Sequence, residues 1–395
     1  MPRPLKEWLR FCWWLAVLSP MDLLVRLVRC KPDARKVLVI RLDAIGDFVL
    51  WLDAARALRT LFPEGEYRLT LLGNEVWTPL AERLGCFDEV WSLNLRRFVV
   101  RPSYRFRLMA GARRAGFGTV IHPTYSRELL CGDATVRITG ARERIGSRGD
   151  LARTNAFLKR ISDRWYTRLL PADPRPLPEI ERNAEFVRGL GVTTFPTRLP
   201  TLFVPNEANV VQESREYYVV CPGAAYEYRQ WPVERFAEIA ARIYNRTGWA
   251  GLVCGGMAER SLSQRLIDIA GVPLKNRAGR TSLVELALLI KSARLVITNE
   301  TAAVHIAAAV GTRTICVLGG GHFGRFLPYH NLDHAGRPLP IAVSVSMDCF
   351  GCNWRCIYNV GPGAPKPCVS HVTVEAVWDS VRSVLNGLAA GTRSP

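Results

Sequence analysis

Short, largely apolar runs alternate along this chain with stretches in which apolar residues recur at helical spacing. The apolar runs predict buried strands, and the stretches between them predict helices. We expect the strands at 37–40, 67–73, 89–93, 119–122, 217–221, 250–254, 295–298 and 314–318. We expect the helices at about 48–61, 75–84, 108–115, 179–190, 232–244, 259–270, 281–292 and 301–310. Strands that alternate with helices form parallel sheets with right-handed crossovers, so the sequence predicts an α/β fold.

A proline-rich stretch over residues 163–205 separates two such α/β runs. It carries one predicted helix amid repeated prolines, which is typical of a link between domains. The chain has 395 residues, which exceeds the size of one ordinary domain. We therefore expect an amino-terminal Rossmann-like domain over residues 36–195 and a carboxyl-terminal one over residues 196–395, with their parallel sheets facing a central cleft.

The first 35 residues are rich in tryptophan, leucine and arginine. The apolar run over 8–18 is too short to cross a bilayer, and Ser19 and Pro20 interrupt it. No small-residue cleavage site stands out, which disfavours a signal peptide, whereas packing on the core remains an alternative. Basic residues flank the apolar ones: Arg3, Lys6, Arg10, Arg26 and Arg29. This composition favours an amphipathic membrane-interface segment over residues 1–35.

The charge balance predicts an anionic partner. The chain has 53 Lys and Arg against 35 Asp and Glu, which gives a formal net charge of +18. Nucleic acid, an anionic membrane surface and a phosphorylated glycolipid all fit that charge. The basic residues are scattered rather than clustered, and no RNA-binding signature is present, so a nucleic-acid partner is disfavoured.

The eleven cysteines fall into two groups. Seven are dispersed, several of them in apolar runs, and suit small buried side chains in a reducing compartment. The other four are clustered at Cys349, Cys352, Cys356 and Cys368. Their spacing permits a structural zinc site but is not that of a well-known zinc finger, and disulfides or free thiols remain open. An iron–sulfur cluster is disfavoured, because nothing else in the sequence indicates electron transfer.

Asp47 lies where the first predicted strand gives way to a helix. Open α/β sheets bind ligands at the carboxyl ends of their strands, so a carboxylate here is placed to orient or deprotonate a hydroxyl. The alternative is that Asp47 only caps its helix or complements the positive helix end. Taken alone, the segment favours this alternative.

Two segments of the carboxyl-terminal domain have the chemistry of an anion site. Arg229 lies between a strand and a helix, where a cation can bind phosphate, although a solvated arginine is the simpler interpretation. Thr301, Ala302 and Ala303 open a helix whose first N–H groups can meet an anion, although Thr301 alone fits a plain helix cap equally well.

Glycines also follow two strands of this domain, at 255–256 and 319–321. They let a ligand approach the backbone closely. Neither pair matches the full dinucleotide fingerprint or the P-loop lysine motif. Hydride transfer and ATP hydrolysis are therefore disfavoured.

Three motifs stand in order along the chain. They are Arg41…Gly46-Asp47, Pro222-Gly223…Arg229-x-Trp231-Pro232 and Asn299-Glu-Thr301…His305-x-Ala-Ala-Ala-x-Gly311. Together they resemble glycosyltransferase family 9, the ADP-heptose:lipopolysaccharide heptosyltransferase family. Each motif is weak by itself, but their combination is specific, and the resemblance covers about residues 36–377.

The resemblance implies a GT-B fold, in which the amino lobe receives the acceptor and the carboxyl lobe binds the nucleotide sugar. It also implies an inverting, metal-independent reaction in which Asp47 is the general base for the acceptor hydroxyl. Arg229 falls where the family usually has lysine, near the donor phosphates. Thr301 and the amides of Ala302 and Ala303 are implied to bind the pyrophosphate.

Further donor-side residues follow from the same resemblance. Gly223 belongs to the second motif, and Glu259 is expected near the nucleoside ribose. The family motif Asp-Thr-Gly is replaced here by Glu300 followed by Thr301 and Ala302. The longer acid and the added methyl group change the donor pocket, so the resemblance indicates the reaction type and leaves the sugar and the base open.

The sequence thus predicts an enzyme that moves a heptose or related sugar from a nucleotide-sugar donor, ADP-heptose by family default. The acceptor is expected to be an anionic glycolipid, either lipopolysaccharide core or another surface glycan. The enzyme is expected in the cytoplasm, peripheral to the inner membrane of a Gram-negative bacterium, with no catalytic cofactor. Two alternatives stay open: a glycosyltransferase of O-antigen or capsule assembly with another donor, and a non-catalytic sugar-nucleotide or glycolipid binding protein.

Overall fold

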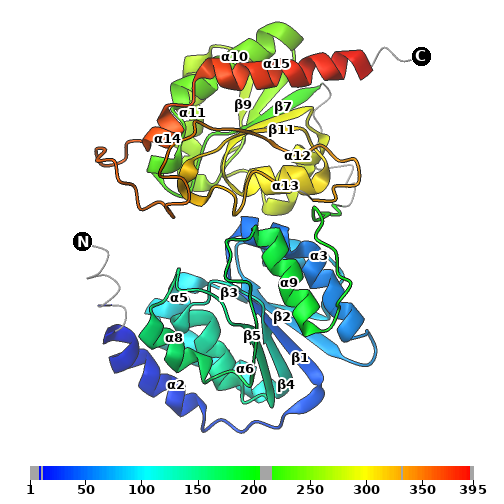
Figure 1. Ribbon diagram of the computed structural model, residues 1–395, viewed down its shortest axis with the longest axis vertical. Helices are drawn as coiled ribbons and strands as arrows, with labels where there is room; N and C mark the ends of the chain where they lie inside the picture. The colour runs from blue at the N-terminus through cyan, green and yellow to red at the C-terminus, as the bar shows by residue number, and fades with distance from the viewer. Residues whose placement is uncertain (1–8, 10–11, 205–215, 331, 392–395) are drawn as a thin grey trace. The chain divides into compact units, whose positions relative to one another are not determined.

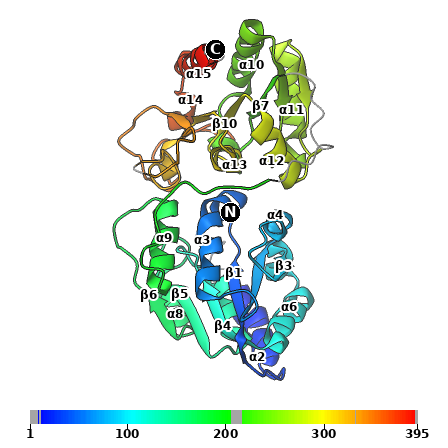
Figure 2. The ribbon, with the colours of Figure 1, turned by 90° about the vertical axis from the view of Figure 1, so that its right-hand side faces the viewer.

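The computed structural model describes residues 9, 12–204, 216–330 and 332–391, which form two compact units (Figures 1 and 2). The first unit comprises Met1–Phe48, Ala54–Arg175 and Arg182–Pro196, and the second comprises Val49–Asp53, Pro176–Glu181 and Thr197–Pro395. Each unit is built on its own six-stranded parallel sheet with helices packed around it. The predicted α/β class with two Rossmann-like sheets is confirmed.

The sheet of the first unit has the strand order β3-β2-β1-β4-β5-β6. Its strands are β1 (Asp33–Arg41), β2 (Arg68–Asn74), β3 (Glu89–Leu93), β4 (Phe117–His122), β5 (Glu143–Ser147) and β6 (Arg168–Leu170). Its main helices are α2 (Ser19–Val25), α3 (Ile45–Leu61), α4 (Thr78–Glu82), α5 (Leu95–Val100), α6 (Pro102–Ala115), α7 (Ala134–Thr139) and α8 (Ala156–Asp163), and α9 (Glu179–Leu190) begins in residues of the second unit. This strand order reverses direction between β1 and β4, where doubly wound sheets bind their ligands.

The sheet of the second unit repeats the same plan, in the order β12-β11-β10-β7-β8-β9. Its strands are β7 (Tyr217–Cys221), β8 (Ala250–Val253), β9 (Leu274–Asn276), β10 (Leu295–Asn299), β11 (Thr314–Val317) and β12 (Ile341–Val343). Its helices are α10 (Val233–Thr247), α11 (Arg260–Ala270), α12 (Leu283–Ser292), α13 (Ala302–Val310), α14 (Pro367–Ser370) and α15 (Val374–Gly391). The order reverses between β7 and β10, which is the corresponding ligand position.

All eight predicted strands are present: they are the inner strands of the two sheets other than β5, together with the edge strand β3. Residues 37–40 of β1 are completely buried, because helices cover both faces of a parallel sheet. Strands β5, β6, β9 and β12 and helix α15 are not predicted from the sequence. The three-residue strands β6, β9 and β12 lie at sheet edges and are too short and too polar to give an apolar run.

The segment before β1 is anchored to the first unit. Leu18 and Val25 are buried in its core, and the carboxylate of Asp22 accepts two hydrogen bonds of 2.7 Å from the guanidinium of Arg105. Both charged groups are buried, so the ion pair is part of the core. The opposite side of the segment exposes apolar side chains, with Leu27 81% accessible.

Part of the predicted membrane-interface segment, namely Trp8 and the basic residues Arg3, Lys6 and Arg10, lies outside the described residues. In the described part of the chain, every helix is too short or too polar to span a bilayer.

Candidate functional site

The turn after β1 is held by a buried polar network at the switch point of the first sheet. Arg41 is completely buried, and its Nε lies 2.7 Å from the carboxylate of Asp43. Thr124, which follows β4, donates a hydrogen bond of 3.2 Å to the same carboxylate. The indole N–H of Trp77 donates to the backbone carbonyl of Asp43 at 2.9 Å. The turn that leads into α3 is therefore fixed from three sides.

Asp47 is the third residue of α3 and is half-buried. The N-cap position of this helix is Ala44, so Asp47 is not the capping residue. Its carboxylate does lie in the first turn, where the helix end favours negative charge. This position at the switch point also suits the predicted general base.

Asn299 ties the two central strands of the second sheet together at their carboxyl ends. It is the last residue of β10 and is 1% accessible. Its amide nitrogen donates to the carbonyls of Pro222 at 2.7 Å and Gly223 at 3.2 Å, just after β7. Its amide oxygen accepts from the backbone N–H of Trp231 at 3.0 Å. From the sequence, Asn299 is recognisable only as the start of a motif, and this bridging role is not predicted.

Glu259 and Gly223 are brought into contact. The Glu259 carboxylate accepts a hydrogen bond of 2.7 Å from the N–H of Gly256, and burial raises its pKa. A Cβ atom at Gly223 would lie 1.8 Å from Glu259 Oε1, and one at Gly255 would lie 2.3 Å from Oε2. A side chain at either glycine would therefore displace the Glu259 carboxylate, which lies beside the turn where the sequence predicts a nucleotide.

Arg229 lies in a cage of aromatic rings. It ends a 3-10 turn, and its guanidinium carbon lies 4.3 Å from the ring centroid of Trp354 and 5.2 Å from that of Tyr226. Its Nε is buried and has no hydrogen-bond partner among the described residues. The contact with Trp354, which is distant along the chain, has no signal in the sequence.

Glu300 follows Asn299, and its carboxyl is under the electrostatic influence of this guanidinium. Both of its carboxylate oxygens are buried, with no hydrogen-bond partner in the described part of the chain. Burial raises the pKa of Glu300 to about 8, and the charge of Arg229 offsets only part of that effect. A buried carboxyl without a partner is costly, so it suits a ligand that brings hydroxyl groups.

Thr301 is the N-cap of α13. Its hydroxyl accepts a hydrogen bond of 3.3 Å from the N–H of Ala303, so the capping alternative holds for this residue. Ala302 is the first helical residue, at the end where backbone N–H groups lack acceptors within the helix. Further along, His305 is buried and its Nδ1 lies 2.6 Å from the hydroxyl of Tyr329. Burial lowers the pKa of His305 to about 4, so its ring is neutral.

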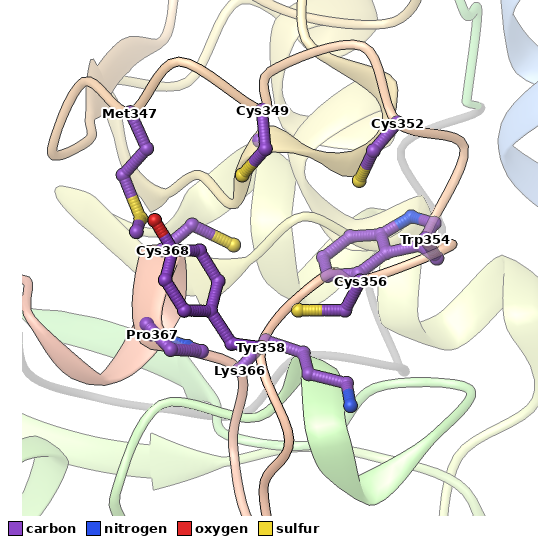
Figure 3. Close-up of a pocket in the computed structure, with 10 residues that line it drawn as sticks. Met347, Cys349, Cys352, Trp354, Cys356, Tyr358, Lys366, Pro367 and Cys368 are labelled. Carbon is purple, nitrogen blue, oxygen red and sulfur yellow. The ribbon is translucent and has the colours of Figure 1, made fainter.

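The four clustered cysteines line one pocket (Figure 3). All four are free thiols, and burial together with the nearness of the other three raises the pKa of Cys368. Across the described residues, no three His, Cys, Asp or Glu side chains are already placed to hold a metal ion. The structure therefore brings the predicted ligands around a common space without forming a closed site.

The predicted site residues thus divide between the units. Asp47 belongs to the first unit, whereas Gly223, Arg229, Glu259 and the residues after Asn299 belong to the second. Asp47 follows β1, Gly223 and Arg229 follow β7, and residues 300–303 follow β10, which are strands that flank the switch points, whereas Glu259 follows the neighbouring strand β8.

Comparison with known proteins gives one family. Residues 200–341 match the model of glycosyltransferase family 9 (heptosyltransferase). The lipopolysaccharide core heptosyltransferase OpsX of Haemophilus influenzae is 28% identical over 123 residues, which are 31% of this chain and 35% of OpsX. The chain thus spans about a third of that relative. Lipopolysaccharide heptosyltransferase 2 of Salmonella typhimurium is 22% identical over 324 residues, which are 77% of this chain and 87% of that protein.

Solved structures share the fold. The Escherichia coli ADP-heptose lipopolysaccharide heptosyltransferase II superposes with a TM-score of 0.67 at 17% identity, covering 90% of this chain and 99% of that one. The dodecameric glycosyltransferase TibC of enterotoxigenic E. coli H10407, described as iron-containing, superposes with a TM-score of 0.53 at 14% identity, covering 91% and 78%. These likenesses confirm the predicted GT-B class.

Proposed function

We propose that this chain, whose residues 200–341 match the model of glycosyltransferase family 9, is an inverting glycosyltransferase that moves a heptose or a related sugar from a nucleotide-sugar donor to a surface-glycan acceptor. The observation that carries this proposal is the buried carboxyl of Glu300, which lies at the switch point of the second sheet within the electrostatic influence of Arg229. A buried carboxyl without a partner accommodates sugar hydroxyls, and a guanidinium beside it accommodates phosphate.

The donor side of the reaction depends on fixed positive groups. Arg229 stabilises the negative charge of the departing nucleoside diphosphate, and the backbone N–H groups at the amino end of α13, which begins at Ala302, stabilise the same charge through the helix dipole. Together these groups take the place of a metal ion at the phosphates. Glu259, beside Gly223, lies within reach of the nucleoside ribose in this arrangement.

The acceptor side depends on Asp47. Its carboxylate takes the proton of the acceptor hydroxyl while that oxygen attacks the anomeric carbon of the donor sugar. The bond from the anomeric carbon to the phosphate oxygen breaks on the opposite face, so the configuration inverts. The nucleoside diphosphate leaves with the bonding electrons.

Replacement of Asp47 by asparagine tests this assignment. The variant keeps the size of the side chain but not the base, so we expect sugar transfer to fall by about 10²–10⁴-fold. ADP binding, measured by titration calorimetry, should stay unchanged because Asp47 acts on the acceptor. Asp379→Asn, an exposed acid on α15, is the matched control. Wild-type rates in Asp47→Asn would refute the role of this residue as base.

The donor sugar follows from the residues around Glu300. ADP-heptose is the family default, but the protonated carboxyl of Glu300 both donates and accepts hydrogen bonds, unlike an ionised aspartate. This difference favours a related sugar as the second candidate. A thermal-shift panel of nucleotide sugars distinguishes them, because the true donor stabilises the folded state most. Binding of a donor without any transfer to glycan acceptors would instead support a non-catalytic binding protein.

We also propose that the enzyme works at the cytoplasmic face of the inner membrane, on an anionic glycolipid. The outer side of the segment before β1 exposes Leu24 and Leu27 next to Arg26 and Arg29, a composition that favours an anionic lipid surface. A Leu24→Ser, Leu27→Ser double variant should therefore bind phosphatidylglycerol vesicles more weakly in co-sedimentation. Ile357→Ser, an equally exposed apolar residue elsewhere, is the control. Equal binding of both variants would refute this surface.

A further inference from the structure

The loop between β12 and α14 is long and irregular for a compact unit. Residues 344–366 are all described and contain neither helix nor strand. Loops of this length in compact domains are usually functional or held by some further constraint. Three of the four clustered cysteines lie in this loop, and the fourth, Cys368, lies in the helix that ends it.

The thiols of this loop converge. In Figure 3 the sulfur atoms of Cys349, Cys352, Cys356 and Cys368 all point into the space between them. None of the four is in a disulfide, and the other seven cysteines are free thiols as well. Four thiols from one short segment around one space match the ligand set of tetrahedral zinc or iron sites.

The same loop is docked on the glycine-rich turn after β11. A Cβ atom at Gly320 would lie 2.2 Å from the ring of Phe350, and one at Gly321 would lie 2.3 Å from the ring of Trp354. The N–H of Asn353 donates to the carbonyl of Gly321 at 2.8 Å. Only glycine leaves room for rings at such close range, so the turn and the loop form one packed unit.

The backbone at the tip of the loop is strained. Asn353 and Trp354 have φ angles of 51° and 59°, in the left-handed region that a bulky residue such as tryptophan rarely adopts. Such strain persists only where the surroundings hold the residue in place. Cys352 directly precedes this pair, and Cys356 follows it by two residues. A link between these cysteines would therefore act directly on the strained tip.

The loop also reaches the donor side. Trp354 places its ring 4.3 Å from the guanidinium carbon of Arg229, and the N–H of Lys366 donates to the carbonyl of Tyr228 at 3.0 Å. The cysteine loop thus contacts the turn that carries Arg229 both at its tip and at its carboxyl end.

We propose that Cys349, Cys352, Cys356 and Cys368 bind one zinc or ferrous ion as thiolates, and that this ion holds Trp354 against Arg229. The loop closes around the ion on binding, because the thiols are gathered but not yet at a closed metal site. The thiols release their protons to solvent as they become ligands, with no change in oxidation state. The ion itself takes no part in sugar transfer; the second half of the proposal rests on the proposed donor role of Arg229.

Metal content tests the site. Full-length protein purified with a thiol reductant should carry about one metal ion per chain by inductively coupled plasma mass spectrometry, as one tetrathiolate site requires. Visible absorption from thiolate-to-iron charge transfer separates iron from colourless zinc. Cys352→Ser and Cys356→Ser should lose the metal, whereas Cys12→Ser, outside the cluster, should keep it.

Two outcomes would overturn the metal site. One is protein that stays free of metal after incubation with zinc and with ferrous iron under reductant. The other is an intact mass lower by four hydrogens, which would show two disulfides in place of ligands.

Donor affinity tests the positioning role. Removing the metal with a chelator should weaken ADP binding by about tenfold, the worth of a desolvated cation–π contact. In an Arg229→Met variant the chelator should have no further effect on ADP binding, because the group that Trp354 positions is gone. Unchanged ADP affinity in metal-free wild type would refute positioning by the ion. Metal bound in a protein that binds no nucleotide at all would refute the proposed function but leave the metal site standing.

Discussion

Replacing Glu300 by glutamine should stabilise the ligand-free protein increasingly as the pH rises. The Glu300 carboxyl is buried without a hydrogen-bond partner among the described residues, and burial raises its pKa from 4.5 to about 8. Below pH 4.5 the folded and unfolded chains both hold the proton, so the group adds no pH dependence. Between pH 4.5 and 8 the unfolded chain ionises first, and the folded state loses stability until the folded pKa is passed.

The size of the effect follows from the two pKa values. At about 1.4 kcal/mol for each pKa unit, the whole difference amounts to about 5 kcal/mol. Between pH 6 and pH 8 the expected loss is about 2 kcal/mol, because the folded group itself begins to ionise near pH 8. For a unit of about 200 residues this corresponds to about 4–8 °C in melting temperature. Glutamine has nearly the same volume and no charge, so its own cost of burial does not vary with pH.

The assay compares melting temperatures of wild type and Glu300→Gln at pH 6, 7 and 8 without ligand. The gap between the two proteins should widen with pH, in favour of the variant. Glu234→Gln, which removes an exposed carboxylate paired with Arg265, should show no widening because solvent screens it. A Glu300→Gln gap that is the same at pH 6 and pH 8 would refute the argument that this carboxyl is neutral in the folded protein.

The remaining predictions concern three residues around the same turn. Gly223→Ala places a methyl carbon against the Glu259 carboxylate, and this overpacking should weaken ADP binding by about tenfold. Titration calorimetry measures the affinity, and an unchanged value would show that Glu259 moves aside without cost. Burial lowers the pKa of His305 to about 4, so the stability of the wild type to urea should fall as the pH drops from 6.5 towards 4. A His305→Gln variant whose stability falls equally would contradict the conclusion that His305 causes this pH dependence. Asn299→Ala removes the side-chain partner of two buried carbonyls and one N–H, so the free energy of unfolding in urea should fall by about 2–4 kcal/mol. A decrease below about 1 kcal/mol would be inconsistent with the bridging role of Asn299.

The inner strands other than β5 were predictable because helices cover both of their faces. This burial demands nearly continuous apolar runs, such as 37–40, and a run of that kind is visible in a single sequence. The three-residue edge strands were not predictable, since β9, for example, is only Leu274–Asn276 and forms because β8 offers it a backbone ladder. Helix α15 is different: Val377, Val381 and Leu385 recur every four residues, so its signal was present and was overlooked.

The positions of the candidate site residues at strand ends were predictable from the sequence, but the contacts between their side chains were not. The sequence placed Asp47 and Arg229 at strand ends from local patterns and from the resemblance to a family. It could not show that Glu259 packs against Gly223, because the order of strands in the sheet brings their loops together. The contact of Arg229 with Trp354 likewise depends on how an irregular loop folds back, for which no sequence period exists.

The buried ion pair between Asp22 and Arg105 has a consequence for any shortened form of this protein. A version that begins at β1 would lack Asp22 and leave the Arg105 guanidinium in the core with the carbonyl of Leu130 and the ring of Phe98 as partners but without a counter-charge from Asp22. Breaking such a pair from one side typically costs about 3–5 kcal/mol, a large share of the stability of an ordinary domain. Trimming the chain for expression, or losing the segment in evolution, therefore requires a simultaneous change at residue 105.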